Sequence, residues 1–226
     1  MRRSLLFLPG NTPNMLINGS CLGADAVIFD LEDAVSPAEK DAARILVRNT
    51  MRYMDLRGCE TVVRINSIDT PYWQQDLDAV MACRPSLILL PKTGTPGDIL
   101  EADRYMAEAE ARLGMASGTV GLMALIETAA GVENAFAIAS ACSRVRALFL
   151  GAEDLTADLQ CKRTKEGREI EYARTRLVVA GRAAGVDVYD TPFTDVNSTR
   201  ASGPMPGWPK PWASRAKPPF LPGMWK

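Results

Sequence analysis

Apolar residues occur along this chain in short unbroken runs, and segments with a helical pattern separate the runs. A run without polar alternation is typical of a parallel strand that is buried on both faces. Seven such runs predict strands at residues 4–8, 26–33, 61–66, 87–92, 121–127, 147–150 and 186–192. The segments between them predict six helices, at residues 12–22, 36–54, 72–82, 96–113, 131–140 and 168–184. At the start of the second, Ser36 is the predicted N-cap, with Glu39 at the capping-box position. Strands that alternate with helices indicate an α/β domain built on a parallel sheet.

Two architectures fit this alternation, an open doubly wound sheet and a closed (β/α)8 barrel. The first strand–helix turn lacks the G-x-G-x-x-G pattern of dinucleotide-binding sheets, and the chain has no Walker motif. Five predicted strands end in or just before a charged residue, namely Asp30, Arg64, Lys92, Glu127 and Asp154. Because a barrel site draws on the ends of many strands, we expect a TIM-type (β/α)8 barrel.

The last part of the chain breaks the pattern. Residues 201–226 contain no Asp or Glu, but they hold seven of the 15 prolines and three of the four tryptophans. Proline on this scale excludes a helix or a central strand. We therefore expect a barrel domain at residues 1–197 that lacks the eighth strand and the closing helix, and an atypical tail at residues 198–226. The tail's composition resembles a coding region read out of frame, which predicts a single-base slip near codons 197–201.

Composition narrows the function classes. The 26 basic and 27 acidic residues nearly cancel, so no charge pattern favours nucleic acid or a membrane surface. No apolar run is long enough to span a membrane, and the first ten residues do not form a signal peptide. The five cysteines show no C-x-x-C spacing and indicate free thiols in the cytoplasm.

The chain contains no histidine. This excludes Ser-His and Cys-His nucleophilic pairs, the H-E-x-x-H zinc motif and any imidazole base. The chemistry must use carboxylates, Arg, Lys, Tyr or a metal ion.

Two of the buried runs end in carboxylates, Glu127 and Asp154, and each run is flanked by a glycine. If these are neighbouring strands, the two carboxylates meet at the rim of the sheet and can share a divalent cation. Magnesium commonly takes one or two protein carboxylates and completes its shell with water and substrate oxygens. Taken singly, each acid fits a cap of the next helix equally well.

Arg64 ends the third predicted strand, and its planar fork suits a substrate carboxylate. The alternative is a salt bridge to Glu32 or Asp33. The acids after the second strand, together with Lys92, also fit a structural ion-pair network at the rim.

Several motifs resemble the citrate lyase beta-subunit family of acyl-CoA lyases, within the phosphoenolpyruvate/pyruvate barrel superfamily. They are RSLLFLPGN (3–11), GADAVIFDLEDAV (23–35), VRIN (63–66), LPK (90–92), IET (126–128) and GAEDL (151–155). The resemblance covers about residues 2–197. It implies a TIM barrel, a Mg²⁺ cofactor, and cleavage of a 3-hydroxyacyl thioester such as citryl-CoA into an acetyl thioester and a 2-oxo acid such as oxaloacetate.

The same resemblance assigns roles to residues. It implies that Glu127 and Asp154 bind the metal and that Arg64 and Glu127 bind substrate. The backbone N–H groups at Gly151 and Ala152 are expected to orient the oxo acid. Related pyruvate aldolases use a histidine base, which this chain lacks, so the thioester lyase branch is favoured.

The resemblance also implies partners: the small thioester and oxo acid, an acyl-carrier protein, other lyase subunits and a homo-oligomer. The residues do not indicate which thioester is used (citryl, citramalyl or malyl). The family pattern stops near Asp195, which leaves the general acid/base unassigned. A non-catalytic remnant or assembly subunit that keeps the metal and oxo-acid pocket is the alternative function.

Overall fold

A computed structural model describes residues 4–56 and 58–191. Its centre is one seven-stranded sheet in which every neighbouring pair is parallel and the strands follow chain order. The strands are β1 (Leu5–Pro9), β2 (Ala26–Asp30), β3 (Glu60–Arg64), β4 (Leu87–Leu90), β5 (Gly121–Ile126), β6 (Val145–Leu150) and β7 (Asp187–Tyr189). All seven predicted strands are present, with shorter bounds at several ends.

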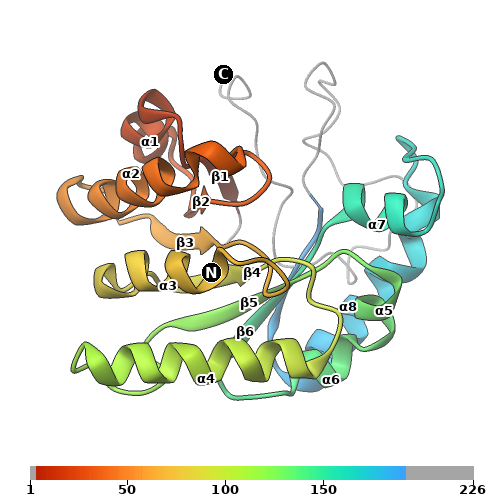
Figure 1. Cartoon of the computed structure of the whole chain (residues 1–226). Helices are drawn as coiled ribbons and strands as arrows, with labels where there is room; N and C mark the ends of the chain where they lie inside the picture. The colour runs from red at the N-terminus through yellow and green to blue at the C-terminus, as the bar shows by residue number, and fades with distance from the viewer. Residues whose placement is uncertain (1–3, 57, 192–226) are drawn as a thin grey trace.

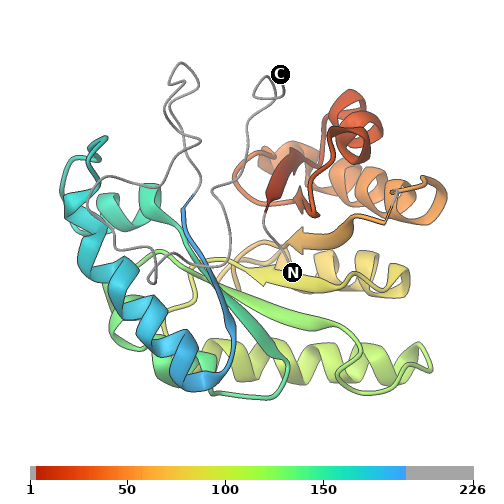
Figure 2. The same cartoon turned by 180° about the vertical axis from the view of Figure 1, so that it is seen from behind.

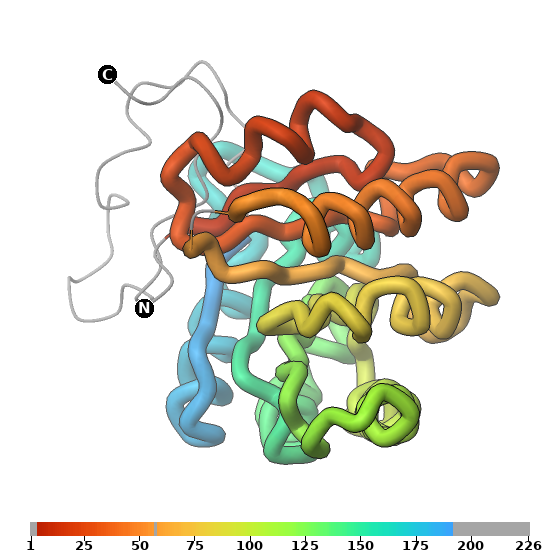
Figure 3. The backbone as a smooth tube through the Cα atoms, turned by 90° about the vertical axis from the view of Figure 1, so that its left-hand side faces the viewer, coloured from red at the N-terminus to blue at the C-terminus, as the bar shows by residue number. Residues whose placement is uncertain are grey.

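The sheet curls, and the helices lie along its outer side (Figures 1 and 3). Figure 2 shows the curl from behind, with α8 beside β6 and β7. The α-helices are α1 (Pro13–Asn18), α2 (Lys40–Tyr53), α3 (Trp73–Val80), α4 (Pro96–Arg112), α5 (Ala129–Glu133), α6 (Ala135–Ala139), α7 (Ala152–Asp158) and α8 (Glu171–Ala184). Short 3₁₀ turns are η1 (Gly19–Leu22), η2 (Pro37–Glu39), η3 (Met81–Cys83) and η4 (Arg168–Ile170).

Both faces of the sheet are buried, which explains the unbroken apolar runs. Along β2, Val27 and Phe29 pack in the larger cluster, which includes side chains of the helices. Ile28, between them, belongs to a smaller cluster formed entirely by strand residues, on the concave face. In that inner cluster the ring of Phe149 lies 6.0 Å from Phe7 and 6.3 Å from Tyr189, measured between centroids. The inside of the curl is therefore a packed core, as in a TIM barrel.

The predicted fold class is confirmed: this is a parallel, curled α/β sheet of the barrel type. The described residues contain seven strands and no eighth, and β1 and β7 are the outermost strands of the sheet. The predicted end of the barrel domain at residue 197, Asp195 and the tail at 198–226 all lie outside the described residues.

Four local predictions differ from the structure. Helix α7 was not predicted, because its seven residues follow β6 directly after Gly151 and carry only a short apolar pattern. The helix expected at 131–140 is divided into α5 and α6 at Asn134. The helix expected at 12–22 ends in the 3₁₀ turn η1. Ser36 makes no side-chain cap. It donates instead to the carboxylate of Glu39, which also accepts from Asn11.

Two predictions from composition can be compared with the structure. All five cysteines are free thiols, as expected. Within residues 4–56 and 58–191, no helix combines the length and apolar character that crossing a membrane requires.

Candidate active site at the carboxyl ends of the strands

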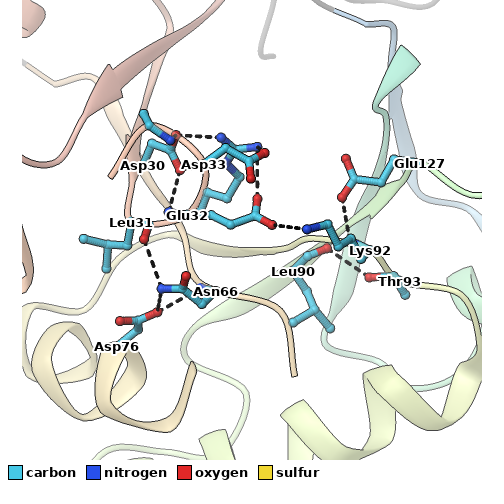
Figure 4. A network of polar contacts seen from close by, with 12 residues as sticks. Asp30, Leu31, Glu32, Asp33, Asn66, Asp76, Leu90, Lys92, Thr93 and Glu127 are labelled. Carbon is cyan, nitrogen blue, oxygen red and sulfur yellow. Dashed lines mark hydrogen bonds and ion pairs between the residues drawn. The ribbon is translucent and has the colours of Figure 1, made fainter. Parts of the chain in front are cut away.

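Charged side chains from five consecutive strand ends meet at one rim of the curled sheet. Asp30 ends β2 and Arg64 ends β3, while Lys92 and Glu127 follow β4 and β5. Asp154 lies in the first turn of α7, directly after β6. The carboxyl ends of parallel strands are where barrel enzymes keep their chemistry. Figure 4 shows the part of this rim that extends from Asp30 to Glu127.

Glu127 is 3% exposed, and its Oε1 accepts a hydrogen bond of 2.7 Å from the backbone N–H of Lys92. Burial is the main cause that raises the pKa of this carboxyl to about 8, and the nearby charges of Glu32 and Asp154 raise it further. The hydrogen bond from Lys92 opposes the shift. Glu127 and Asp154 are therefore close enough to repel each other, as a shared metal site requires.

The side chain of Glu127 is held against a glycine. A Cβ added at Gly151 would lie 2.6 Å from Oε2 and 2.8 Å from the Cβ of Glu127. Lys92 has a φ of 51°, a left-handed conformation that is uncommon for a residue with a side chain. Such conformations cluster at functional sites. Here the backbone of Lys92 points its N–H at one oxygen of Glu127, and the missing side chain at Gly151 leaves room for the other.

This arrangement fits a magnesium ion. The donors are carboxylate oxygens, which hard cations prefer, and a cation would offset the burial and the repulsion that together raise the pKa of Glu127. In the described part of the chain, no cluster of three or more His, Cys, Asp or Glu residues forms a complete protein cage. Glu127 and Asp154 would therefore hold the ion as a pair, with water and substrate oxygens in its other positions.

Arg64 is engaged more fully than the sequence indicated. Its Nε and Nη2 donate to the two carboxylate oxygens of Asp30, at 2.7 and 2.6 Å. Its Nη1 lies 3.2 Å from Glu32 and 3.5 Å from Asp33, and the guanidinium stands over the ring of Phe7. Burial lowers the pKa of Arg64, but the bonds to Asp30 and the nearby acids outweigh it and raise the pKa. The guanidinium of Arg64 therefore already binds a protein carboxylate, that of Asp30, through two of its nitrogens.

Glu32 lies between two cations and is 5% exposed. Arg64 Nη1 is 3.2 Å from its Oε2, and Lys92 Nζ is 3.2 Å from its Oε1 (Figure 4). Neither oxygen accepts a well-aligned hydrogen bond from the described residues. Burial raises the pKa of Glu32, although the charge of Arg64 acts against it. A buried carboxylate with incomplete hydrogen bonding is unusual and marks a site of function or strain.

Hydrogen bonds between the backbone and the side chains of Asp30 and Lys40 fix the loop that carries Glu32. The carboxylate of Asp30 accepts the backbone N–H groups of Glu32 and Ala34, at 2.9 and 3.2 Å. The buried ammonium of Lys40 donates to the carbonyls of Leu31 and Glu32, both at 2.7 Å. Asp30 therefore fixes both Arg64 and this loop.

The predicted donors at Gly151 and Ala152 are not free in this structure. The N–H of Gly151 donates to the carbonyl of Ile126 at 2.9 Å, and that of Ala152 donates to Thr191 Oγ1 at 3.2 Å. In this arrangement both N–H groups therefore have acceptors within the protein. Their role in substrate binding stays a prediction, which now depends on the space beside Gly151.

Glu127 and Asp154, the predicted metal pair, follow neighbouring strands, and their role as ligands stays a prediction. The sequence indicated a salt bridge of Arg64 with Glu32 or Asp33 as an alternative, and both acids lie near its Nη1, at 3.2 and 3.5 Å, but it did not indicate Asp30, the main partner. It left Lys92 ambiguous, because the left-handed backbone that points the N–H of Lys92 at Glu127 has no sequence signal at a non-glycine residue.

The chain was compared with known proteins. A family model described as HpcH/HpaI aldolase/citrate lyase matches residues 3–202. Citrate lyase subunit beta from Leuconostoc mesenteroides subsp. cremoris is 43% identical over 197 residues, which cover 87% of this chain and 65% of that protein. Human mitochondrial citramalyl-CoA lyase is 30% identical over 205 residues, covering 86% of this chain and 60% of that one.

A solved structure agrees with both the fold and the family. The citrate lyase beta subunit from Mycobacterium tuberculosis, complexed with oxaloacetate and magnesium, superposes with a TM-score of 0.70 at 31% identity. The match covers 86% of this chain and 80% of that one. This chain spans just under two thirds of the length of its curated relative from Leuconostoc. The extent of the family match and these identities show that the chain belongs to the HpcH/HpaI aldolase/citrate lyase family.

Proposed function

We propose that the chain is a Mg²⁺-dependent carbon–carbon lyase, which cleaves a 3-hydroxyacyl thioester to an acetyl thioester and a 2-oxo acid such as oxaloacetate. One observation carries the proposal: Glu127, buried and with a pKa raised to about 8, lies near the Asp154 carboxylate at neighbouring strand ends. A buried acid that is destabilised by another acid needs a cation to be stable in its charged form. Relatives named as citrate lyase subunit beta and citramalyl-CoA lyase support this class of reaction.

In the cleavage, the substrate hydroxyl loses its proton, the carbon–carbon bond breaks, and the hydroxyl carbon becomes a ketone. The electron pair of the broken bond becomes an enolate of the thioester, which takes up a proton to give the acetyl thioester. A bound Mg²⁺ would supply Lewis acidity at the hydroxyl and carboxylate oxygens. Glu127 and Asp154 would hold this ion, and Gly151 keeps open the space beside Glu127 Oε2.

The substrate's negative charge must be matched by protein cations. Arg64 and Lys92 supply them at the rim, where they now pair with Asp30 and Glu32. A substrate carboxylate would compete with these acids, and the water expelled on binding would strengthen each remaining ion pair. The described residues that surround the site therefore bind and orient substrate, while the group that moves the proton is not assigned.

A substrate panel tests the proposal. Purified chain, with Mg²⁺ or with EDTA, is incubated with citryl-, citramalyl- and malyl-CoA, and the released oxo acid is identified by mass spectrometry. We expect turnover of one thioester, and its loss with EDTA. If none of the three is cleaved while the folded chain still binds Mg²⁺, the lyase assignment fails.

A second candidate is a non-catalytic remnant or assembly subunit that keeps the metal and oxo-acid pocket. The observation that favours it is the seven-stranded sheet of the described residues, in which β1 and β7 have no strand between them. This candidate predicts binding of Mg²⁺ and oxaloacetate without turnover, and turnover in a version extended by a family-type C-terminal unit. Robust turnover by the chain as it is would reject it.

Partners are part of the same proposal. The name of the Leuconostoc relative describes one subunit of a larger enzyme, which supports action with other lyase subunits. An acyl-carrier protein is proposed as a partner from the family resemblance alone. We also propose that the chain forms a homo-oligomer and acts in the cytoplasm. Light scattering at several concentrations measures the first of these.

A further inference from the structure

The proposed substrate class poses a question of charge. A dicarboxylic oxo acid such as oxaloacetate has one carboxylate beside its keto group and a second, distal one. The carboxylate beside the keto group would bind the Mg²⁺ ion that Glu127 and Asp154 hold. The distal carboxylate needs a protein cation of its own, since an unpaired charge in a partly buried pocket is unfavourable.

Arg64 is poorly placed to be this cation alone. Two of its three nitrogens donate to Asp30 at 2.6 and 2.7 Å, a bidentate pair that is the strongest form of ion pair. Only Nη1 is directed elsewhere, at Glu32 and Asp33. Arg64 is also mostly buried, with 13% of its side chain exposed. Moving it would disrupt the loop fixed by Asp30.

Lys92 differs from Arg64 on each of these points. Its side chain is 44% exposed, and its ammonium pairs with Glu32 at 3.2 Å. That pair lacks the alignment of a good hydrogen bond. If Lys92 turned away, Glu32 would keep Arg64 Nη1 as a partner. Exchange of Glu32 for another carboxylate therefore disturbs little else.

The backbone of Lys92 stays in place while its side chain exchanges partners. Its N–H is bonded to Glu127 Oε1 at 2.7 Å, and the next residue, Thr93, is fixed by hydrogen bonds to Leu90 and Leu125. A flexible four-carbon stem thus extends from a fixed point next to the proposed metal ligand. Figure 4 shows the ammonium reaching from this point toward Glu32.

We propose that Lys92 is the residue that selects dicarboxylic oxo acids: its ammonium leaves Glu32 and pairs with the distal carboxylate of the bound acid. In the free protein, Glu32 occupies the place of that carboxylate. The inference deepens the proposed function and rests on it. The role in specificity is supported by the exposed ammonium of Lys92 and by the hydrogen bond that fixes its backbone beside Glu127.

The test compares two acids that differ in the distal carboxylate. Binding of freshly dissolved oxaloacetate and of pyruvate is measured by calorimetry in the presence of Mg²⁺, with the full chain and with Lys92→Met and Lys92→Arg. Losing one charge-assisted hydrogen bond should weaken oxaloacetate binding by about tenfold in Lys92→Met. Pyruvate binding should change less than about twofold, because pyruvate has no distal carboxylate. Lys92→Arg should recover most of the loss.

Two controls separate this role from a structural one. Arg104→Met removes the same charge from an exposed pair with Glu108 on α4 and should leave both affinities unchanged. Binding of Mg²⁺ alone to Lys92→Met should be unchanged or tighter, since a positive charge near the site is removed while the backbone N–H to Glu127 remains. Weaker binding of Mg²⁺ alone would show that the side chain only positions Glu127, and would overturn the inference.

The outcomes distinguish the inference from the function beneath it. If the unaltered chain binds neither acid with Mg²⁺, the proposed function fails and the inference fails with it. If it binds oxaloacetate but Lys92→Met binds equally well, or loses both acids to the same extent, only the role of Lys92 is rejected.

Discussion

Two networks of buried charges lie at opposite ends of the strands, and they differ in completeness. At the amino ends, Glu110 is fully buried, and both of its oxygens accept hydrogen bonds. The donors are the backbone N–H groups of Gly118 and Val120, at 2.9 and 3.0 Å, and two nitrogens of Arg144, at 2.9 and 3.0 Å. Arg144 also donates to Asp103 at 2.6 Å. Burial raises the pKa of Glu110, but these donors outweigh it and keep the pKa below its usual value.

At the carboxyl ends, the network is incomplete. Both oxygens of Glu32 lack well-aligned donors, and the pKa of Glu127 is raised to about 8, mainly by burial. The acids of this network outnumber its cations, which are Lys40, Arg64 and Lys92; the acids are Asp30, Glu32, Asp33, Glu127 and Asp154. The comparison teaches that a buried charge network with every group satisfied stabilises the fold, whereas one left short of cations is arranged to receive a ligand.

The largest expected effect comes from breaking the complete network. Arg144→Met leaves Glu110 as a buried charge without its main partner, which should lower the free energy of unfolding by about 3–5 kcal/mol. Urea denaturation measures this. Arg112→Met, which breaks an exposed pair with Asp78, should change it by less than about 1 kcal/mol. Equal effects would contradict the structural role given to Arg144.

A glycine substitution tests the crowding at the incomplete network. In Gly151→Ala, the new Cβ would lie 2.6 Å from Glu127 Oε2, so the carboxylate must move and Mg²⁺ binding should weaken by about tenfold or more. Gly94→Ala is the matched control, because its Cβ would meet no atom closer than 3.9 Å. Calorimetric Mg²⁺ affinities of the two variants should differ, and identical values would remove Gly151 from the site.

The raised pKa of Glu127 also predicts a pH dependence of stability. The folded-state pKa of Glu127 lies near 8, above the ordinary 4.5. The raised pKa favours the folded state below about pH 4.5, and this stability is lost as pH rises toward 8. In EDTA, Glu127→Gln cannot ionise, so its melting temperature should exceed that of the unaltered chain by roughly 10 °C at about pH 9 and converge with it near about pH 5. A constant difference across this range would show that Glu127 does not titrate as described.

Much of the fold could be predicted from the sequence, because buried parallel strands have a strong local signal. The run that became β5 and the run that became β6 are apolar at every core position, and their glycines lie where the chain passes close to another residue. Helix α7 could not be predicted in the same way, since seven residues carry too little periodicity. The capping box formed at Thr95 and Asp98, whereas Ser36 made no cap, because its hydroxyl found a side-chain partner.

The sequence suggested which acids belong to the candidate site, but it did not indicate which charged side chains pair with one another. Glu127 and Asp154 follow buried runs, and this placement alone suggested them as metal ligands. The bidentate pair of Arg64 with Asp30 depends on the parallel register of β2 and β3, which places the two residues opposite each other. The positive φ of Lys92 is imposed by tertiary contacts, so no local pattern indicated it.

Binding of Mg²⁺ to the full chain tests the central claim most directly. Calorimetry is done at about pH 8, where Glu127 is partly ionised, with the unaltered chain, Glu127→Gln, Asp154→Asn and the distant control Asp103→Asn. Because magnesium needs both carboxylates, each of the first two variants should lose at least about 100-fold in affinity. Asp103→Asn, at the opposite end of the strands, should bind as the unaltered chain does. Unchanged affinity in both Glu127→Gln and Asp154→Asn, with the variants folded, would contradict the account.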